Sequence, residues 1–269
     1  MKKIDYIIAT ILFFLLLFIW LGDLAWISTS DDTIPILVSL PIFIWLGSPW
    51  HFIDENRPLS KIGLCLGALL SLIGVLFGST LLMAIGWTTL LWTWLKARLE
   101  GEPLQKIKKL LIFPLMTFPW ITLDFNQIGW WFRLSGAWVT SMILQFFGYE
   151  VQQMGTNLVV NGILISIDVA CAGINTLQSM LIAGSVINFV YLGNSIRYWW
   201  NIPVLVAISW IANTLRIIAI CFAALAMGPE FAVDLFHNWG GWAVLVLMFG
   251  LCWAVISIQE PNSKNNNNY

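Results

Sequence analysis

The stretch ATILFFLLLFIWLG, residues 9–22, contains no charged residue and is apolar apart from Thr10. A helix that crosses the hydrocarbon core of a bilayer, about 30 Å thick, needs about 20 mainly apolar residues and bonds its own backbone groups internally. Together with the residues just before it, this stretch is long enough to cross. Lys2 and Lys3 precede it as in a secretory signal, but no small-x-small cleavage site follows, so we expect a retained membrane helix.

The rest of the chain has the same apolar character. Hydrophobic residues make up 59% of the 269 residues and charged residues only 10%, whereas about a quarter of the residues of a soluble domain are charged. We therefore expect an all-α polytopic membrane protein with about eight transmembrane helices and a small outer-face β-hairpin. The predicted spans lie near residues 4–22, 33–48, 62–77, 79–95, 109–123, 172–192, 201–226 and 237–257.

The basic residues indicate how the chain is threaded through the cell (inner) membrane. With a cytoplasmic N-terminus, nearly all Lys and Arg residues fall on the inner side, as the positive-inside rule requires, and only Arg133 and Arg216 fall in the outer half. Both termini are then cytoplasmic. Residues 96–109 are expected to be a solvated basic loop against anionic lipid headgroups, so membrane lipids are a predicted partner. Residues 136–148 are too short to span and are expected to be interfacial or re-entrant.

The outer side is predicted to hold residues 124–170. Trp130 and Trp131 suit the headgroup level. In TNLVVNGILIS, residues 156–166, two β-rich runs flank Asn161-Gly162, a pair typical of a type I′ hairpin turn. The expected regions are N-terminal transmembrane helices at 1–123, an outer loop, interfacial helix and hairpin at 124–170, C-terminal transmembrane helices at 171–257 and a disordered polar tail at 258–269.

Three polar residues are predicted at the outer ends of three different helices. Cys171, in ACAG, lies at the first turn of one helix, and His237 opens the last span. Arg216, in NTLRII, lies well inside a span, where an arginine costs at least about 2.5 kcal/mol and is a functional-site hypothesis by default. The three supply a nucleophile, a fixed cation for an oxyanion and a proton carrier. Each residue also has a structural alternative. Cys171 could be a small-residue helix contact, Arg216 could extend to the outer headgroups, and His237 could be an interfacial or capping residue.

Three neighbouring residues could support this group. Asn213 lies one turn before Arg216 on the same face and could orient it. Asn175, one turn after Cys171, could line the pocket or bond between helices, and Asp168 is expected to cap the helix. The other cysteines, expected to be small buried residues within spans, are Cys65, Cys221 and Cys252.

Other chemistry has no signal in the chain. There is no Gly-rich phosphate loop or metal-spaced His/Cys cluster, and the two histidines, His51 and His237, are predicted on opposite sides of the membrane. We expect no metal, no cofactor and no nucleic-acid partner.

In order and spacing, the polar residues resemble those of the exosortase/archaeosortase family of membrane-embedded, sortase-like transpeptidases. The family's small-Cys-small-Gly stretch is matched by ACAGI, residues 170–174, its N-x-x-R-I by residues 213–217, and its histidine at a following helix start by His237. The resemblance covers about the last 120 residues, whereas the N-terminal spans agree only in hydropathy. Ala172 stands where many members have Ser, which removes a possible hydroxyl donor and leaves the subtype open.

The resemblance implies a thiol protease or transpeptidase that acts on the outer, periplasmic side. Its substrates would be exported proteins with a C-terminal sorting signal, which is a short Pro-containing motif, a transmembrane helix and a basic tail, as in PEP-CTERM proteins. Cys171 would form a thioester, Arg216 would stabilise the oxyanion, and His237 would transfer protons, with transfer of the product to a cell-surface acceptor as one outcome. Two alternatives stay open, namely a transporter or binding protein whose Arg216 holds an anionic substrate, and an acyltransferase that uses Cys171 with a lipid donor.

Overall fold

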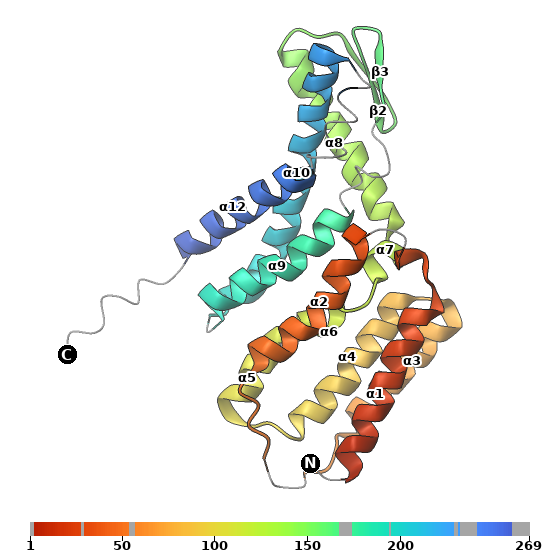
Figure 1. The fold of residues 1–269 in the computed structure, drawn as a ribbon, viewed down its shortest axis with the longest axis vertical. Helices are drawn as coiled ribbons and strands as arrows, with labels where there is room; N and C mark the ends of the chain where they lie inside the picture. Colours follow the sequence, from red (N-terminus) through yellow and green to blue (C-terminus); the bar gives the residue numbers. More distant parts are fainter. Residues whose placement is uncertain are drawn as a thin grey trace, which may run out of the picture. The chain divides into compact units, whose positions relative to one another are not determined.

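The computed structural model describes residues 3–27, 30–53, 57–166, 174–193, 195–228, 231 and 241–259. The described chain is mostly helical with one small antiparallel sheet, which confirms the predicted helical class (Figure 1). It divides into two compact units, Met1–Phe125 and Asn126–Tyr269. Each unit is described by itself below.

In its described residues, the first unit contains helices and no strand. They are α1 (Lys3–Gly22), the short 3-10 helix η1 (Ala25–Ile27), α2 (Ser30–Gly47), α3 (Lys61–Phe77), α4 (Thr80–Lys96), α5 (Gly101–Leu110), α6 (Ile112–Met116) and α7 (Trp120–Asp124). A tight turn at Gly78, with φ of 64°, joins α3 to α4. The two helices approach closely because Gly67, Gly74 and Gly86 lie between them, and a Cβ at Gly74 would lie 2.6 Å from the Met83 side chain.

The Asp124 carboxylate, at the end of α7, fixes the start of α4. It accepts hydrogen bonds from the Ser79 hydroxyl at 2.9 Å and from the backbone N–H groups of Thr80 at 3.1 Å and Leu81 at 2.7 Å. The first N–H groups of a helix have no partner inside the helix, and a carboxylate there also complements the helix dipole. Asp124 therefore joins two segments that are more than 40 positions apart in the sequence.

The expected basic loop at 96–109 is wrong in two respects. Arg98 is buried and its Nε atom donates to Asp5 Oδ1 of α1 at 2.7 Å, so it is part of the packing and not a solvated anchor. Residues 101–110 form helix α5, which turns Ile107 and Leu110 inward and exposes Lys108. Apolar residues at helical spacing explain this arrangement, because they give α5 one face that can be buried.

The predicted span at 109–123 is not one continuous helix. The chain is broken at Leu111, between α5 and α6, and again at residues 117–119, between α6 and α7. Prolines explain both breaks. Pro114 lacks the N–H that would bond to the carbonyl of Leu110, and Pro119 disfavours helical geometry at Phe118.

The second unit combines helices with the sheet. Its elements are α8 (Asn126–Phe146), β1 (Val151–Met154), β2 (Asn157–Val160), β3 (Ile163–Ile165), α9 (Ile174–Leu192), α10 (Arg197–Met227) and α12 (Gly241–Gln259). The interfacial or re-entrant segment expected at 136–148 is instead the second half of α8, a 21-residue helix. The polar residues in the first half of α8, including Arg133, lower the hydropathy of that half. Hydropathy alone therefore indicates a segment shorter than the helix.

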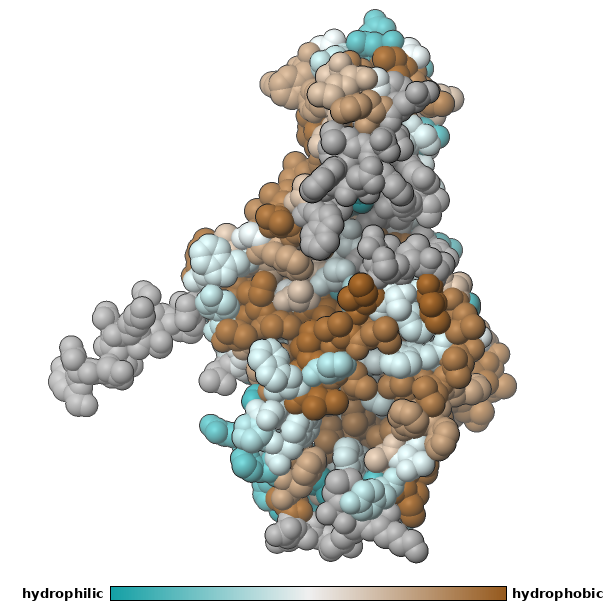
Figure 2. Space-filling view, viewed as in Figure 1, coloured by the Kyte–Doolittle hydropathy of each residue, from teal (hydrophilic) through white to brown (hydrophobic). Residues whose placement is uncertain are grey.

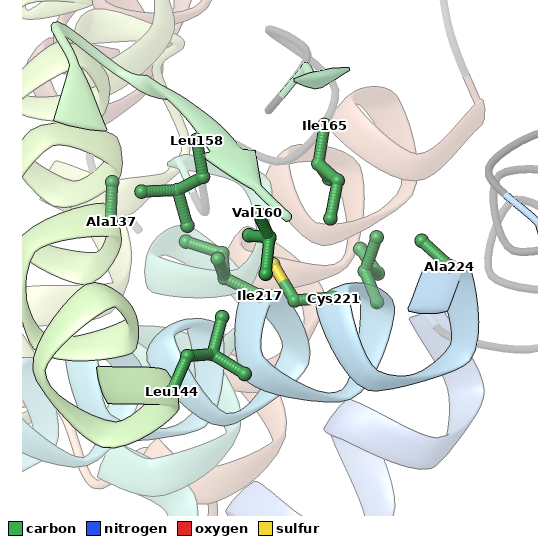
Figure 3. Close-up of a cluster of buried hydrophobic side chains, with 9 residues drawn as sticks. Ala137, Leu144, Leu158, Val160, Ile165, Ile217, Cys221 and Ala224 are labelled. Carbon is green, nitrogen blue, oxygen red and sulfur yellow. The ribbon is translucent and has the colours of Figure 1, made fainter. Parts of the chain in front are cut away.

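The predicted hairpin is present and is extended by a third strand. Asn161 and Gly162 have φ of 50° and 80°, as a type I′ turn requires, and β2 pairs antiparallel with β3 around them. Strand β1, which was not predicted, pairs with the other edge of β2. Alternate residues of the sheet pack on α8 and α10 in one apolar cluster (Figure 3), which contains Ala137, Leu144, Leu158, Val160, Ile165, Ile217, Ile220, Cys221 and Ala224.

Exposed apolar surface marks α1 and α3. Phe14 is 63% exposed, Ile62 81% and Phe77 80%. Figure 2 shows hydrophobic residues over much of this unit and hydrophilic residues near α5. Soluble monomers rarely expose contiguous apolar patches of this kind, so a lipid environment accounts for them. Cys65 also lies exposed on α3, so the prediction that it is buried is wrong, whereas the predicted burial of Cys221 and Cys252 is confirmed.

Two described helices are long and apolar enough to cross a membrane, at Asp5–Gly22 and Arg197–Met227. Four shorter apolar helical segments lie at Thr33–Gly47, Lys61–Phe77, Thr176–Leu192 and Ala243–Gln259. The number of about eight spans therefore remains a prediction.

Candidate functional site

The predicted site residues differ in what the structure shows of them. Arg216 and Asn213 lie on α10 with their side chains described, and Asn175 lies in the first turn of α9, where only its backbone is described. The other three predicted residues lie outside the described part of the chain, and they are Asp168, Cys171 and His237.

One face of α10 carries three polar side chains. Ser209, Asn213 and Arg216 follow one another at intervals of four and three residues, which places them on neighbouring turns of the same face. Ser209 and Asn213 are fully buried, and Arg216 is half-buried. The rest of α10 is dominated by Ile, Ala and Leu, which form a helix readily and bury against the surrounding helices.

Helix α8 packs along α10 in a parallel direction. The Trp210 indole N–H donates to the Ser135 hydroxyl at 2.9 Å, and a Cβ at Gly136 would lie 2.8 Å from Ile217 Cδ1. Gly136 thus permits close contact between the helices.

Helix α9 packs against α10 in the opposite direction. The Asn201 amide donates to Asn188 Oδ1 at 3.0 Å, and the Asn188 amide donates to the Tyr198 carbonyl at 2.8 Å. One turn further along, a Cβ at Gly184 would lie 2.7 Å from the Leu205 side chain. Extending this antiparallel register places Gln178 of α9, which is 2% exposed, between the levels of Ser209 and Asn213.

Gln178, Ser209, Asn213 and Arg216 form what we term the polar cluster. Buried polar atoms of all four side chains have no hydrogen-bond partner in the described structure, and they are Gln178 Nε2, Ser209 Oγ, Asn213 Nδ2, Asn213 Oδ1 and Arg216 Nε. Most buried polar atoms of folded proteins do have a partner, so five such atoms in one region require an explanation.

The described helices of the second unit carry no negative charge that could pair with the polar cluster. Helices α8, α9, α10 and α12 contain no Asp or Glu, so no carboxylate on the helices that pack around Arg216 offsets its charge. The cluster offers three N–H donors, one carbonyl acceptor and one hydroxyl. A ligand with carbonyl or anionic oxygens would match it. No group of three or more His, Cys, Asp or Glu residues that could hold a metal occurs among the described residues.

Half of the polar cluster can be predicted from the sequence. Arg216 and Asn213 were predicted as a pair, but Gln178 and Ser209 were missed. A glutamine within an apolar segment is itself a signal for an interhelical or ligand contact. Which helix Gln178 faces depends on how α9 packs against α10, and the residues around Gln178 do not determine that packing.

Comparison with known proteins gave one match. A family model described as transmembrane exosortase matches residues 11–254 of the chain. No curated protein and no solved structure matches it.

Proposed function

Because the chain belongs to the transmembrane exosortase family, whose members process sorting signals of exported proteins, we propose that it is a cysteine peptidase or transpeptidase. In this proposal Cys171 is the nucleophile, Arg216 stabilises the oxyanion and His237 transfers protons. The substrates are exported proteins with a C-terminal sorting signal that contains a transmembrane helix and a basic tail. Residues 171–257 supply all three catalytic side chains.

The proposed reaction has two halves. The Cys171 thiolate attacks the carbonyl carbon of the scissile peptide, and the carbonyl electrons move to oxygen, where the Arg216 guanidinium stabilises the charge. The C–N bond then breaks, His237 gives a proton to the leaving amine, and a thioester remains on Cys171. Water or an acceptor amine next attacks the thioester, His237 removes its proton, and the thiolate leaves.

The observation that carries the proposal is the state of Arg216. Its Nε atom is buried without a partner, and the helices packed around it provide no carboxylate. Arg216 lies 19 residues after the start of α10, or about 28 Å along the axis, close to the far boundary of a hydrocarbon core about 30 Å thick. A guanidinium held there is available to a negative charge that forms during the reaction.

The nucleophile can be tested by substitution in the full chain. We expect Cys171→Ala and Cys171→Ser to leave a co-expressed reporter with a C-terminal sorting signal uncleaved, with normal expression of the protein. Cys65→Ala is the matched control, because Cys65 is exposed on α3 and its removal leaves no cavity. Complete cleavage by Cys171→Ala would overturn the assignment of Cys171 as the nucleophile.

We further propose that the site faces the outer, periplasmic side and that both termini are cytoplasmic. The distribution of Lys and Arg supports this orientation. A protease-cleavable tag inserted at the exposed turn Asn161-Gly162 should be cut by protease added outside intact cells. Protection of that tag until the membrane is opened would reverse the assigned orientation.

A further inference from the structure

We propose that Gln178 and Asn213 bind the main chain of the substrate, and that the bound segment is extended and not helical. This inference rests on the proposed function, because it concerns the polypeptide that would be cleaved beside Arg216. It adds Gln178, which lies on a different helix, to the residues that contact the substrate.

The first argument is a contrast within one helix pair. Asn188 and Asn201 are buried between α9 and α10, and each amide finds a partner within 3.0 Å. Asn213 lies on the same helix as Asn201 and is equally buried, but neither its Nδ2 nor its Oδ1 atom has a hydrogen-bond partner. The Nε2 atom of Gln178 has no partner either. A structural amide would resemble the Asn188–Asn201 pair. Asn213 and Gln178 therefore have the polar groups of a binding surface and not those of a structural contact.

The second argument concerns the chemistry of the ligand. Asn213 presents a donor and an acceptor in one plane, which complements the C=O and N–H groups of a peptide main chain. An anion such as a carboxylate would use the donors of Gln178 and Arg216 but would leave Asn213 Oδ1 without a partner. An apolar lipid chain would satisfy none of these atoms.

The third argument determines the conformation of the bound segment. In a transmembrane helix the backbone N–H and C=O groups bond to each other, so they are not available to Asn213 or Gln178. The two ends of a helix do have free main-chain groups, but one end offers only N–H and the other only C=O. A segment that offers both kinds of group to Asn213 is therefore extended or unwound. The segment beside the polar cluster must therefore lie outside the helical part of the sorting signal or unwind when it binds.

The test is steady-state kinetics with the purified full-length protein and a synthetic peptide that carries the C-terminal sorting signal of an exported protein. We expect Gln178→Leu and Asn213→Leu each to raise KM by about 3- to 10-fold, the loss expected for one hydrogen bond, while the melting temperature stays equal or rises. Asn188→Leu is the matched control. It should lower the melting temperature and leave KM unchanged, because it removes hydrogen bonds within the protein.

A second measurement identifies the main-chain contact directly. Single peptide bonds of the synthetic substrate are replaced in turn by esters, each of which removes one N–H donor. One ester should lower kcat/KM for the wild-type protein but cause no further loss in Asn213→Leu, because both changes remove the same hydrogen bond. Fully additive losses at every scanned position would overturn the proposal.

The outcomes separate this inference from the proposed function. If Cys171→Ala still cleaves the peptide, the proposed function fails. If cleavage needs Cys171 but KM is unchanged in both Leu variants, the proposed function stands and the main-chain contact is refuted. A lower melting temperature of Asn213→Leu with unchanged KM would likewise refute it, because it would show that Asn213 binds structural water.

Discussion

The ion pair between Asp5 and Arg98 allows a quantitative test of what holds the first unit together. Asp5 Oδ1 lies 2.7 Å from Arg98 Nε and 3.1 Å from the Trp94 indole nitrogen, and both charged side chains are only 7% exposed. Asp5→Asn keeps the shape of the side chain but removes its charge, which leaves the Arg98 guanidinium buried without its carboxylate. Breaking a buried pair in this way typically costs about 3 to 5 kcal/mol of unfolding free energy.

A second ion pair provides the control. Arg57 Nη2 and Glu100 Oε2 are also 2.7 Å apart, but their side chains are 40% and 61% exposed. Since the two distances are equal, burial is the difference that decides the result. Water screens the exposed pair, so we expect Glu100→Gln to cost at most about 1 kcal/mol.

The measurement is equilibrium unfolding of the full-length protein in mixed micelles with increasing SDS, followed by circular dichroism. The double variant Asp5→Asn with Arg98→Gln should recover most of the loss caused by Asp5→Asn alone, because it leaves no buried charge. If Asp5→Asn costs no more than Glu100→Gln, the buried pair does not contribute as argued. A double variant as unstable as Asp5→Asn would show that shape and not charge matters at this position.

Three further predictions concern the site and the first unit. Arg216→Lys keeps a positive charge but loses the planar set of donors, so we expect cleavage of a tailed reporter to fall by about 10² to 10³ with normal expression; normal cleavage would remove Arg216 from the oxyanion role. His237→Ala should slow resolution of the thioester by about 10² to 10⁴, and intact-mass measurement should then detect the acyl group on Cys171, whereas unchanged turnover would leave the site without a base. Asp124→Ala should lower the unfolding free energy by about 1 to 2 kcal/mol through loss of the cap on α4, measured by the same SDS titration, and a change within error would exclude a capping role.

Features that neighbouring residues determine are predictable from this sequence, whereas contacts between distant residues are not. The turn at Asn161-Gly162 was predicted correctly because two adjacent residues determine it. The burial of Arg98 could not be predicted, because its partner Asp5 lies 93 positions away in the sequence. The basic residues around Arg98 indicate a solvated segment instead. The breaks in the predicted span at 109–123 are likewise local, because Pro114 and Pro119 interrupt that span in the sequence itself.

The candidate site followed the same rule. Arg216 and Asn213 were found together because their spacing places them on one face of one helix. Gln178 was missed because its relation to them depends on the antiparallel packing of α9 against α10. The roles of Cys171 and His237 remain predictions, as they lie outside the described residues.

The central position of α10 has a consequence for biosynthesis. Helices α8, α9 and α12 each contact α10, and the sheet packs on its residues 217–224. During translation, α8, the sheet and α9 all leave the ribosome before α10, so they must wait in or at the membrane without their main packing partner. The first unit ends at Phe125, so all of its helices have been synthesised before α8 begins. A nascent chain arrested before Met227 should therefore carry a folded first unit and a protease-sensitive second unit. Insertion of α10 is then the step that completes assembly of the second unit.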